Sequence, residues 1–148
     1  MAGGTRCAAL VGPYLSGKTT LLESLLFTAG AIHRKGTVKD GNTVGDASDE
    51  ARARNMSTEI SPGAMNYLGE DWTILDCPGS IELMQEYLGA LNVADVAVVV
   101  VEPAIDRSTT LSPVFRALEA RGTPHMIFIN KVDTLTAEIP DVAAAMRS

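Results

Sequence analysis

Short apolar runs alternate with amphipathic stretches along most of this 148-residue chain. The apolar runs are strand-like, whereas the amphipathic stretches have apolar positions three and four residues apart, which is the spacing of a helix. Some of the runs are bounded by glycine or proline, which favours a turn there. The pattern predicts strands near 6–11, 58–68, 71–76, 95–102 and 125–130, helices near 18–29, 81–91 and 108–121, and the start of another helix over 137–147.

Strands that are apolar along their whole length and alternate with helices are typical of a parallel, doubly wound α/β sheet. Such a sheet binds its ligand at the carboxyl ends of the strands. The adjacent strands near 58–68 and 71–76, joined around Gly69, are expected to form one antiparallel edge. The polar connection over residues 30–57 is long for a compact domain, and such connections are often functional, although its charges would also be explained by solvation.

The first candidate for chemistry is Gly12-x-x-x-x-Gly17-Lys18-Thr19, which follows the first predicted strand and opens the first predicted helix. In that context the glycines let backbone N–H groups wrap a phosphate at a helix N-terminus. Lys18 would reach the β- and γ-phosphates, and the Thr19 hydroxyl would ligate Mg²⁺. A glycine-containing turn is the structural alternative, and the pattern alone does not separate ATP from GTP. The predicted phosphate contacts are Gly12, Pro13, Tyr14, Leu15, Ser16, Gly17, Lys18, Thr19 and Thr20.

The second candidate is Asp76-Cys77-Pro78-Gly79, at the end of the strand near 71–76. A carboxylate at a strand end can hold Mg²⁺ through water, and the Gly79 N–H can approach a γ-phosphate. A Pro-Gly turn that closes a strand explains the same residues equally well.

The third candidate, Asn130-Lys131-Val132-Asp133, follows the run His125–Ile129, which we interpret as a buried strand. Guanine presents donors at N1 and N2 where adenine does not, so the Asp133 carboxylate can accept both. The Lys131 stem can lie over the base plane, and Asn130 can tie this loop to the phosphate loop. All three candidates in this order predict one guanine-nucleotide pocket.

Composition narrows the class of protein further. The chain is 46% hydrophobic, which suits an α/β domain with a buried core. Its formal net charge of −6 argues against broad binding of nucleic acids, DNA included, or of membranes by this segment. We expect Cys7 and Cys77 to be reduced in a cytoplasmic protein, with a reactive thiol as the minor alternative for Cys77. The N-terminus lacks the apolar stretch of a signal peptide, and Val96–Val101 is too short to span a bilayer.

With these motifs in order, the chain resembles the N-terminal part of the G domain of translational GTPases, most of all elongation factor G and elongation-factor-G-like proteins. The similarity runs from about Cys7 to Thr134. Residues 50–57 resemble the first switch of the family, so 30–57 is expected to be the switch-I-like loop. By that match Ser57, or else Thr58, stands where the family has a Mg²⁺-ligating threonine, although a surface serine before a strand is the alternative.

Two departures concern chemistry. The family has histidine, which orients the attacking water, where this chain has Ser80, and aspartate where it has Leu15. Ser80 could instead be the N-cap of the helix beginning near Ile81. A third departure is length: the family continues with a further helix, a strand, a Ser-Ala-type loop and more domains, so residues 1–148 are expected to be a partial, C-terminally truncated G domain.

The resemblance implies Mg²⁺-dependent binding of GTP and GDP with GTP hydrolysis, as part of an elongation-factor-G-like translational GTPase. Lys18 would be the main catalytic group, Ser80 a doubtful one, and a ribosome could be engaged through domains outside this chain. The alternative, which Ser80 and Leu15 favour, is a GTP-dependent switch module with little or no hydrolysis. An ATP-using P-loop enzyme is a weaker alternative, because Asp133 argues against it.

Overall fold

The computed structural model describes residues 4–45, 59–80, 84–103, 108–134, 140–141 and 144. Its centre is a five-stranded sheet in the order β2-β3-β1-β4-β5. β1 pairs in parallel with β3 and β4, β4 pairs in parallel with β5, and β2 runs antiparallel to β3. The predicted fold class, a mostly parallel sheet with one antiparallel edge strand, is confirmed. The strands are β1 (Arg6–Val11), β2 (Ser61–Tyr67), β3 (Glu70–Asp76), β4 (Val96–Val101) and β5 (His125–Ile129).

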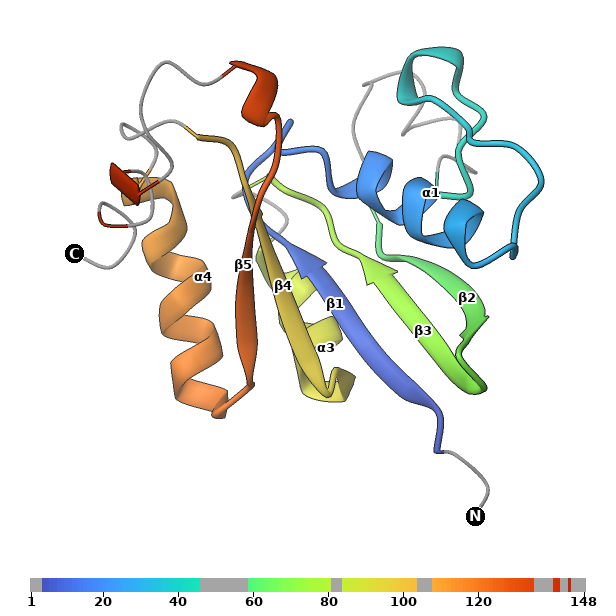
Figure 1. Cartoon of the computed structure of the whole chain (residues 1–148). Coiled ribbons are helices and arrows are strands. Elements are labelled where there is room, and N and C mark those ends of the chain that lie inside the picture. Colours follow the sequence, from blue (N-terminus) through green and yellow to red (C-terminus); the bar gives the residue numbers. More distant parts are fainter. Residues whose placement is uncertain are drawn as a thin grey trace.

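Helices cover both faces of the sheet (Figure 1). Helix α1 (Lys18–Thr28) packs on one face, and α3 (Met84–Val93) and α4 (Ser108–Arg121) pack on the other. Two short 3₁₀ helices, η1 (Val38–Asp40) and η4 (Val132–Thr134), follow α1 and β5. Of the helix predicted near 137–147, Pro140, Asp141 and Ala144 are helical, and the other residues lie outside the described ones, as do Ser57, Thr58 and Ile81.

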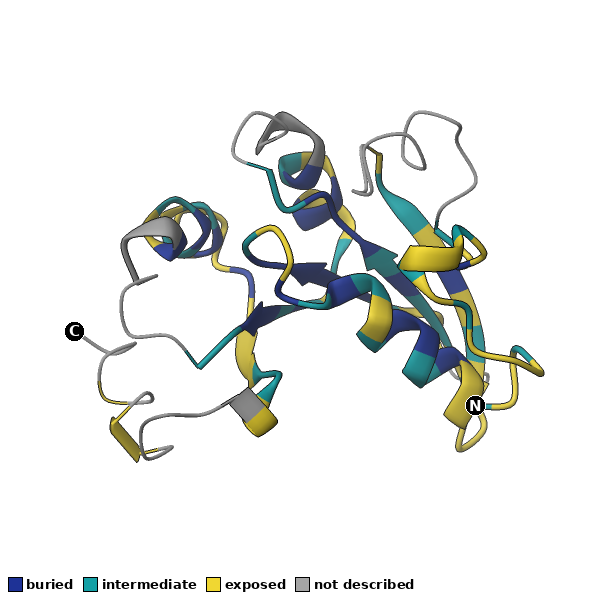
Figure 2. Cartoon of the chain, turned by 90° about the horizontal axis from the view of Figure 1, so that it is seen from above, coloured by how far each residue is buried: buried dark blue, intermediate teal, exposed yellow. Residues whose placement is uncertain are grey.

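The alternating side chains of β1 divide the core into two layers. Ala9 and Val11 join the cluster under α3 and α4, whereas Ala8 and Leu10 join the cluster under α1. This is why β1 and β4 are apolar at successive positions: each face of an interior parallel strand is covered by a helix. The view from above shows the buried positions concentrated along these strands (Figure 2).

The prediction that His125–Ile129 is a buried strand was wrong in one respect. These residues do form β5, but four of the five are exposed, including Met126 at 54%. The reason is position: β5 lies at the end of the sheet and, among the described residues, pairs only with β4. An apolar run predicts a strand, but it does not predict how many neighbours that strand has. The described part of the chain also contains no helix long and apolar enough to cross a membrane.

The packing of α4 against the sheet gives a test of the core. Leu118 is 0% exposed within the cluster under α3 and α4. We expect Leu118→Ala to lower the free energy of unfolding by about 2–5 kcal/mol, because it removes buried methyl groups and leaves a cavity. Urea denaturation followed by circular dichroism measures this change.

Leu68 supplies the matched control, because it is 87% exposed in the turn between β2 and β3. Leu68→Ala should change stability by no more than about 0.5 kcal/mol. Similar losses for the two variants would contradict this account of the core.

Candidate nucleotide-binding site

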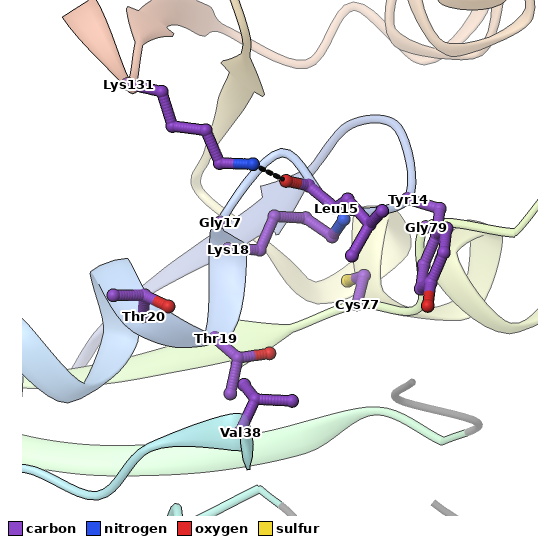
Figure 3. A pocket seen from close by; sticks show the side chains of 10 residues that line it. All are labelled: Tyr14, Leu15, Gly17, Lys18, Thr19, Thr20, Val38, Cys77, Gly79 and Lys131. Atoms are coloured by element: carbon purple, nitrogen blue, oxygen red, sulfur yellow. Dashed lines mark hydrogen bonds between the residues drawn. The ribbon is translucent and has the colours of Figure 1, made fainter. Parts of the chain in front are cut away.

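The three candidate loops meet at one edge of the sheet, where β1, β3 and β5 end. They surround a cavity of about 220 Å³. Figure 3 shows the side chains that line it. Predicted site residues that line the cavity are Tyr14, Leu15, Gly17, Lys18, Thr19, Thr20, Cys77, Gly79 and Lys131.

The loop after β1 is shaped by two glycines with positive φ. At Gly12, with φ +139°, a Cβ would lie 2.2 Å from the backbone oxygen of Val100. At Gly17, with φ +92°, a Cβ would lie 2.3 Å from Asn130 Nδ2. Any side chain at either position would therefore push the loop away from β4 or from the loop after β5. Pro13 and Ser16 complete the turn, in which Ser16 N donates to Pro13 O.

Lys18 is a buried cation directed back onto this loop. It is 6% exposed, and its Nζ donates to Gly12 O at 3.0 Å and to Pro13 O at 2.8 Å. Burial lowers the pKa of Lys18 to about 8, an effect that the neighbouring Asp76 opposes only in part. An anionic ligand in the cavity would favour the charged form of this amine.

Thr19 and Asp76 form a second polar pair at the cavity. The Thr19 hydroxyl donates to Asp76 Oδ2 at 2.6 Å, and Asp76 is 1% exposed at the end of β3. A hydroxyl beside a carboxylate presents the hard oxygen ligands that Mg²⁺ prefers, so the donor set fits this ion. In the described part of the chain, no group of three His, Cys, Asp or Glu side chains could hold a metal. Further Mg²⁺ ligands would have to come from phosphate, water or residues such as Ser57, which lies outside the described ones.

The loop after β3 packs directly on the phosphate loop. A Cβ at Gly79 would lie 2.5 Å from Lys18 Nζ and 2.7 Å from Tyr14 N, so only glycine fits between them. Pro78 and Cys77 are buried, and Ser80 is half-buried. Burial, reinforced by Asp76, raises the pKa of Cys77 to about 12. The minor alternative of a reactive Cys77 thiol is therefore wrong, because its loop is packed rather than open to solvent.

The loop after β5 is tied to the phosphate loop by two side chains. Asn130 Nδ2 donates to Ser16 O at 2.9 Å, which is the contact expected from the sequence. Lys131 Nζ donates to Leu15 O at 2.7 Å and pairs with Glu102. The side chain of Lys131 thus crosses one side of the cavity (Figure 3). Val132 and Asp133 follow in η4, where both are exposed.

Two residues at the site were missed by sequence reasoning. Glu102 directly follows β4 and holds Lys131, and its place at the carboxyl end of a strand was a usable signal. Val38 of η1 lines the cavity from the loop after α1, and no local pattern indicated it.

Comparison with known proteins agrees with this geometry. The family profile for the elongation factor Tu GTP binding domain matches residues 4–148. The chain belongs to this family of translational GTPase G domains. The resemblance expected from the sequence is therefore confirmed, and the binding of guanine nucleotide is the property that the family shares.

Individual relatives agree with the family. An elongation factor G-like protein of Synechocystis sp. is 50% identical over 143 residues, covering 97% of this chain and 21% of the relative. Elongation factor G 2 of Streptomyces coelicolor is 30% identical, covering 89% of this chain and 19% of the relative. Tetracycline resistance protein TetO of Campylobacter jejuni is 32% identical, covering 90% of this chain and 21% of the relative. The chain thus spans about a fifth of the length of these relatives.

Solved structures share the fold. A crystal structure of a protein from Thermus thermophilus aligns with a TM-score of 0.88 and 31% identity, over 96% of this chain and 21% of that one. A bacterial selenocysteine-specific elongation factor aligns with a TM-score of 0.69 over 96% of this chain and 22% of that one, and at 18% identity it supports the fold alone.

The pKa of Lys18 gives this site a testable pH dependence. In the free protein the amine loses its proton as pH rises through about 8. Phosphate favours the charged form, so binding above that pH must take up a proton. We expect GDP affinity to fall about threefold between pH 7.5 and 8.5, because the charged fraction of a lysine with a pKa of about 8 falls by about that factor over this interval.

Titration calorimetry in two buffers of different ionisation enthalpy measures this proton uptake directly. Lys18→Ala should bind more weakly at both pH values and take up less proton than the wild-type chain at pH 8.5, which separates Lys18 from ionisations of the nucleotide. Equal uptake by both proteins would rule Lys18 out as the group responsible.

Proposed function

We propose that this chain provides Mg²⁺-dependent GTP and GDP binding to an elongation-factor-G-like translational GTPase, and that it takes part in GTP hydrolysis. The observation that carries the proposal is the joining of the phosphate loop and the base loop by the Asn130–Ser16 hydrogen bond. A generic phosphate-binding turn needs no such link to a distant Asn-Lys-x-Asp loop. Residues 30–57 would act as the switch-I-like loop, of which 46–57 lies outside the described residues.

Each loop has a proposed role. Backbone N–H groups between Gly12 and Thr20 cradle the phosphates, and Lys18 neutralises their charge. Thr19 and, through water, Asp76 would hold Mg²⁺, which would supply charge neutralisation to the phosphates. The Gly79 N–H contacts the γ-phosphate from the loop that already packs on Tyr14.

Base recognition is assigned to the loop after β5. The Asp133 carboxylate accepts hydrogen bonds from guanine N1 and N2. The Lys131 stem lies beside the base, because its amine is held to Leu15 O at 2.7 Å and to Glu102.

The rate of GTP hydrolysis distinguishes this proposal from the alternative, a GTP-dependent switch module with little or no hydrolysis. Ser80 stands one residue beyond Gly79, where the family has its water-orienting histidine, and Leu15 replaces an aspartate on the phosphate loop. A serine hydroxyl is shorter than an imidazole and uncharged. Because a positioned proton-transfer group typically contributes about 10²–10⁴-fold, the rate depends on whether Ser80 can act in its place.

The overall proposal is tested by calorimetry of this chain with GDP, GTP and ATP in the presence of Mg²⁺. We expect both guanine nucleotides to bind and ATP to bind far more weakly. Comparable affinities for GTP and ATP would contradict the proposal. Single-turnover hydrolysis by the longer protein that contains this chain, with and without ribosomes, tests the translational part.

Specificity for guanine should depend on Asp133. The Asp133→Asn variant loses the carboxylate that accepts from N1 and N2, and its new amide can donate to the C2 oxygen of xanthine. We expect weaker GTP binding and stronger XTP binding, measured by competition among GTP, XTP and ATP. An equal loss for all three nucleotides would show that Asp133 does not contact the base.

The rate of hydrolysis should respond to Ser80 without a matching change in binding. The Ser80→His variant should raise the single-turnover rate with little change in GTP affinity, because it supplies a group that can align water. Ser80→Ala is the companion variant and should change a low rate only slightly. If Ser80→Ala abolishes substantial activity, then Ser80 itself positions the water and the switch-only alternative is wrong.

A further inference from the structure

One buried carboxylate of α1 has no role in the site described above. Glu23 is 2% exposed and lies on the face of α1 that also buries Leu22 and Leu26. Its Oε2 accepts from Gly36 N at 2.7 Å, and its Oε1 accepts from Val44 N at 2.6 Å. A buried carboxylate is costly unless it is hydrogen-bonded, and short bonds from N–H groups to an ionised acceptor are the stronger kind. The two backbone N–H groups, of Gly36 and Val44, therefore offset the cost of burying the Glu23 carboxylate.

These two points are the ends of one compact loop, residues 36–45. The chain passes so close to itself that a Cβ on Gly36 would lie 2.4 Å from Asn42 O. Inside the loop, Thr37 N donates to Asn42 Oδ1 at 2.7 Å, and the Thr37 side chain caps η1 by accepting from Asp40 N. The loop is thus held together by its own hydrogen bonds, and the Glu23 carboxylate attaches it to α1 near both of its ends.

The loop 36–45 meets the nucleotide site at both members of the Thr19–Asp76 pair. Val38 lines the same cavity as Thr19, and Figure 3 shows the two side chains at the same side of the pocket. At the other end, Ser61 Oγ donates to Gly45 O at 3.0 Å, and a Cβ on Gly45 would lie 3.8 Å from Asp76 Oδ2. Moving this loop would therefore open the wall of the cavity beside both oxygen ligands.

We propose that Glu23 is a positioning residue for the metal side of the nucleotide pocket. By holding Gly36 and Val44, it keeps Val38 and Gly45 against Thr19 and Asp76 and so excludes water there. This inference rests on the proposed function, because it assumes that the Thr19–Asp76 pair holds Mg²⁺ beside the phosphates. It predicts an effect of Glu23 on Mg²⁺-dependent nucleotide binding, although the hydrogen bonds of the Glu23 carboxylate go to Gly36 N and Val44 N.

The chemistry of the two contacts selects the variants. Glu23→Gln has nearly the same shape, but its amide nitrogen is a donor and cannot accept from a second N–H, so one of the two loop contacts is lost. Glu23→Ala removes both. Ser24→Ala is the matched control, since Ser24 is the next residue of α1 and also contacts this region, accepting from Lys35 Nζ at 3.1 Å on the exposed side.

The first measurement needs no nucleotide. Amide hydrogen exchange of the free chain, resolved by NMR, should be faster at Gly36 and Val44 in Glu23→Gln and Glu23→Ala than in the wild type or Ser24→Ala. The second measurement is GDP affinity with Mg²⁺ and with EDTA. Outer-shell residues that orient metal ligands typically contribute about 10- to 100-fold, so the gain in affinity that Mg²⁺ provides should fall by about that factor in Glu23→Ala. Binding in EDTA should change little.

Three results would overturn the inference. Unchanged exchange at Gly36 and Val44 in Glu23→Gln would show that the carboxylate does not hold the loop. In both Glu23 variants, GDP affinity that is unchanged with Mg²⁺ and unchanged with EDTA would show that the loop does not act on the metal side. An equal loss of affinity with Mg²⁺ and with EDTA would indicate a general loss of structure. Failure of the proposed function would look different, because the wild-type chain itself would then bind no guanine nucleotide.

Discussion

The hydrogen bond from Asn130 Nδ2 to Ser16 O joins loops that are 114 residues apart in the sequence, and the shape of the pocket depends on it. It forms only because Gly17 has no side chain, since a Cβ there would lie 2.3 Å from that nitrogen. The sheet order makes the approach possible: only β4 separates β1 from β5, so their carboxyl ends lie close together. Chain topology thus brings the loops together, and one glycine and one amide hold them at a defined spacing.

Several residues of the site carry a free-energy cost. Lys18 is a cation buried deeply enough that its pKa falls to about 8. Leu15 and Lys131 have φ of +65° and +54°, a left-handed conformation that favours glycine. Such costs persist where the surrounding structure enforces them, and they are typical of functional sites. A phosphate in the cavity would offset the cost at Lys18, because it would give the buried amine an oppositely charged partner.

Periodicity predicted the helices and strands well, since apolar runs and helical spacing are local properties of the chain. β1, β4 and α4 begin and end within a residue or so of the expected positions. The burial of β5 was misjudged because exposure depends on neighbours, which a run of apolar residues does not specify. Val38 was missed because it reaches the cavity through the path of the loop after α1, which no local pattern specifies. Glu102 was missed although its place at the carboxyl end of β4 was a usable signal. The three motifs could be predicted because each is a short local pattern at the end of a predicted strand, and in two of them the glycines reflect backbone geometry within one turn.

Leu15 and Ser80, where the resemblance leads us to expect departures from the family, lie outside the contacts that join the loops of the pocket. Leu15 takes part through its backbone oxygen, which accepts from Lys131, so this contact does not depend on which side chain stands at position 15. Ser80 lies beyond Gly79, the last residue of its loop that must fit against Tyr14 and Lys18. Neither position contributes a side chain to the Asn130–Ser16 link or to the Thr19–Asp76 contact. The contacts that join the three loops therefore do not depend on the side chains of Leu15 and Ser80.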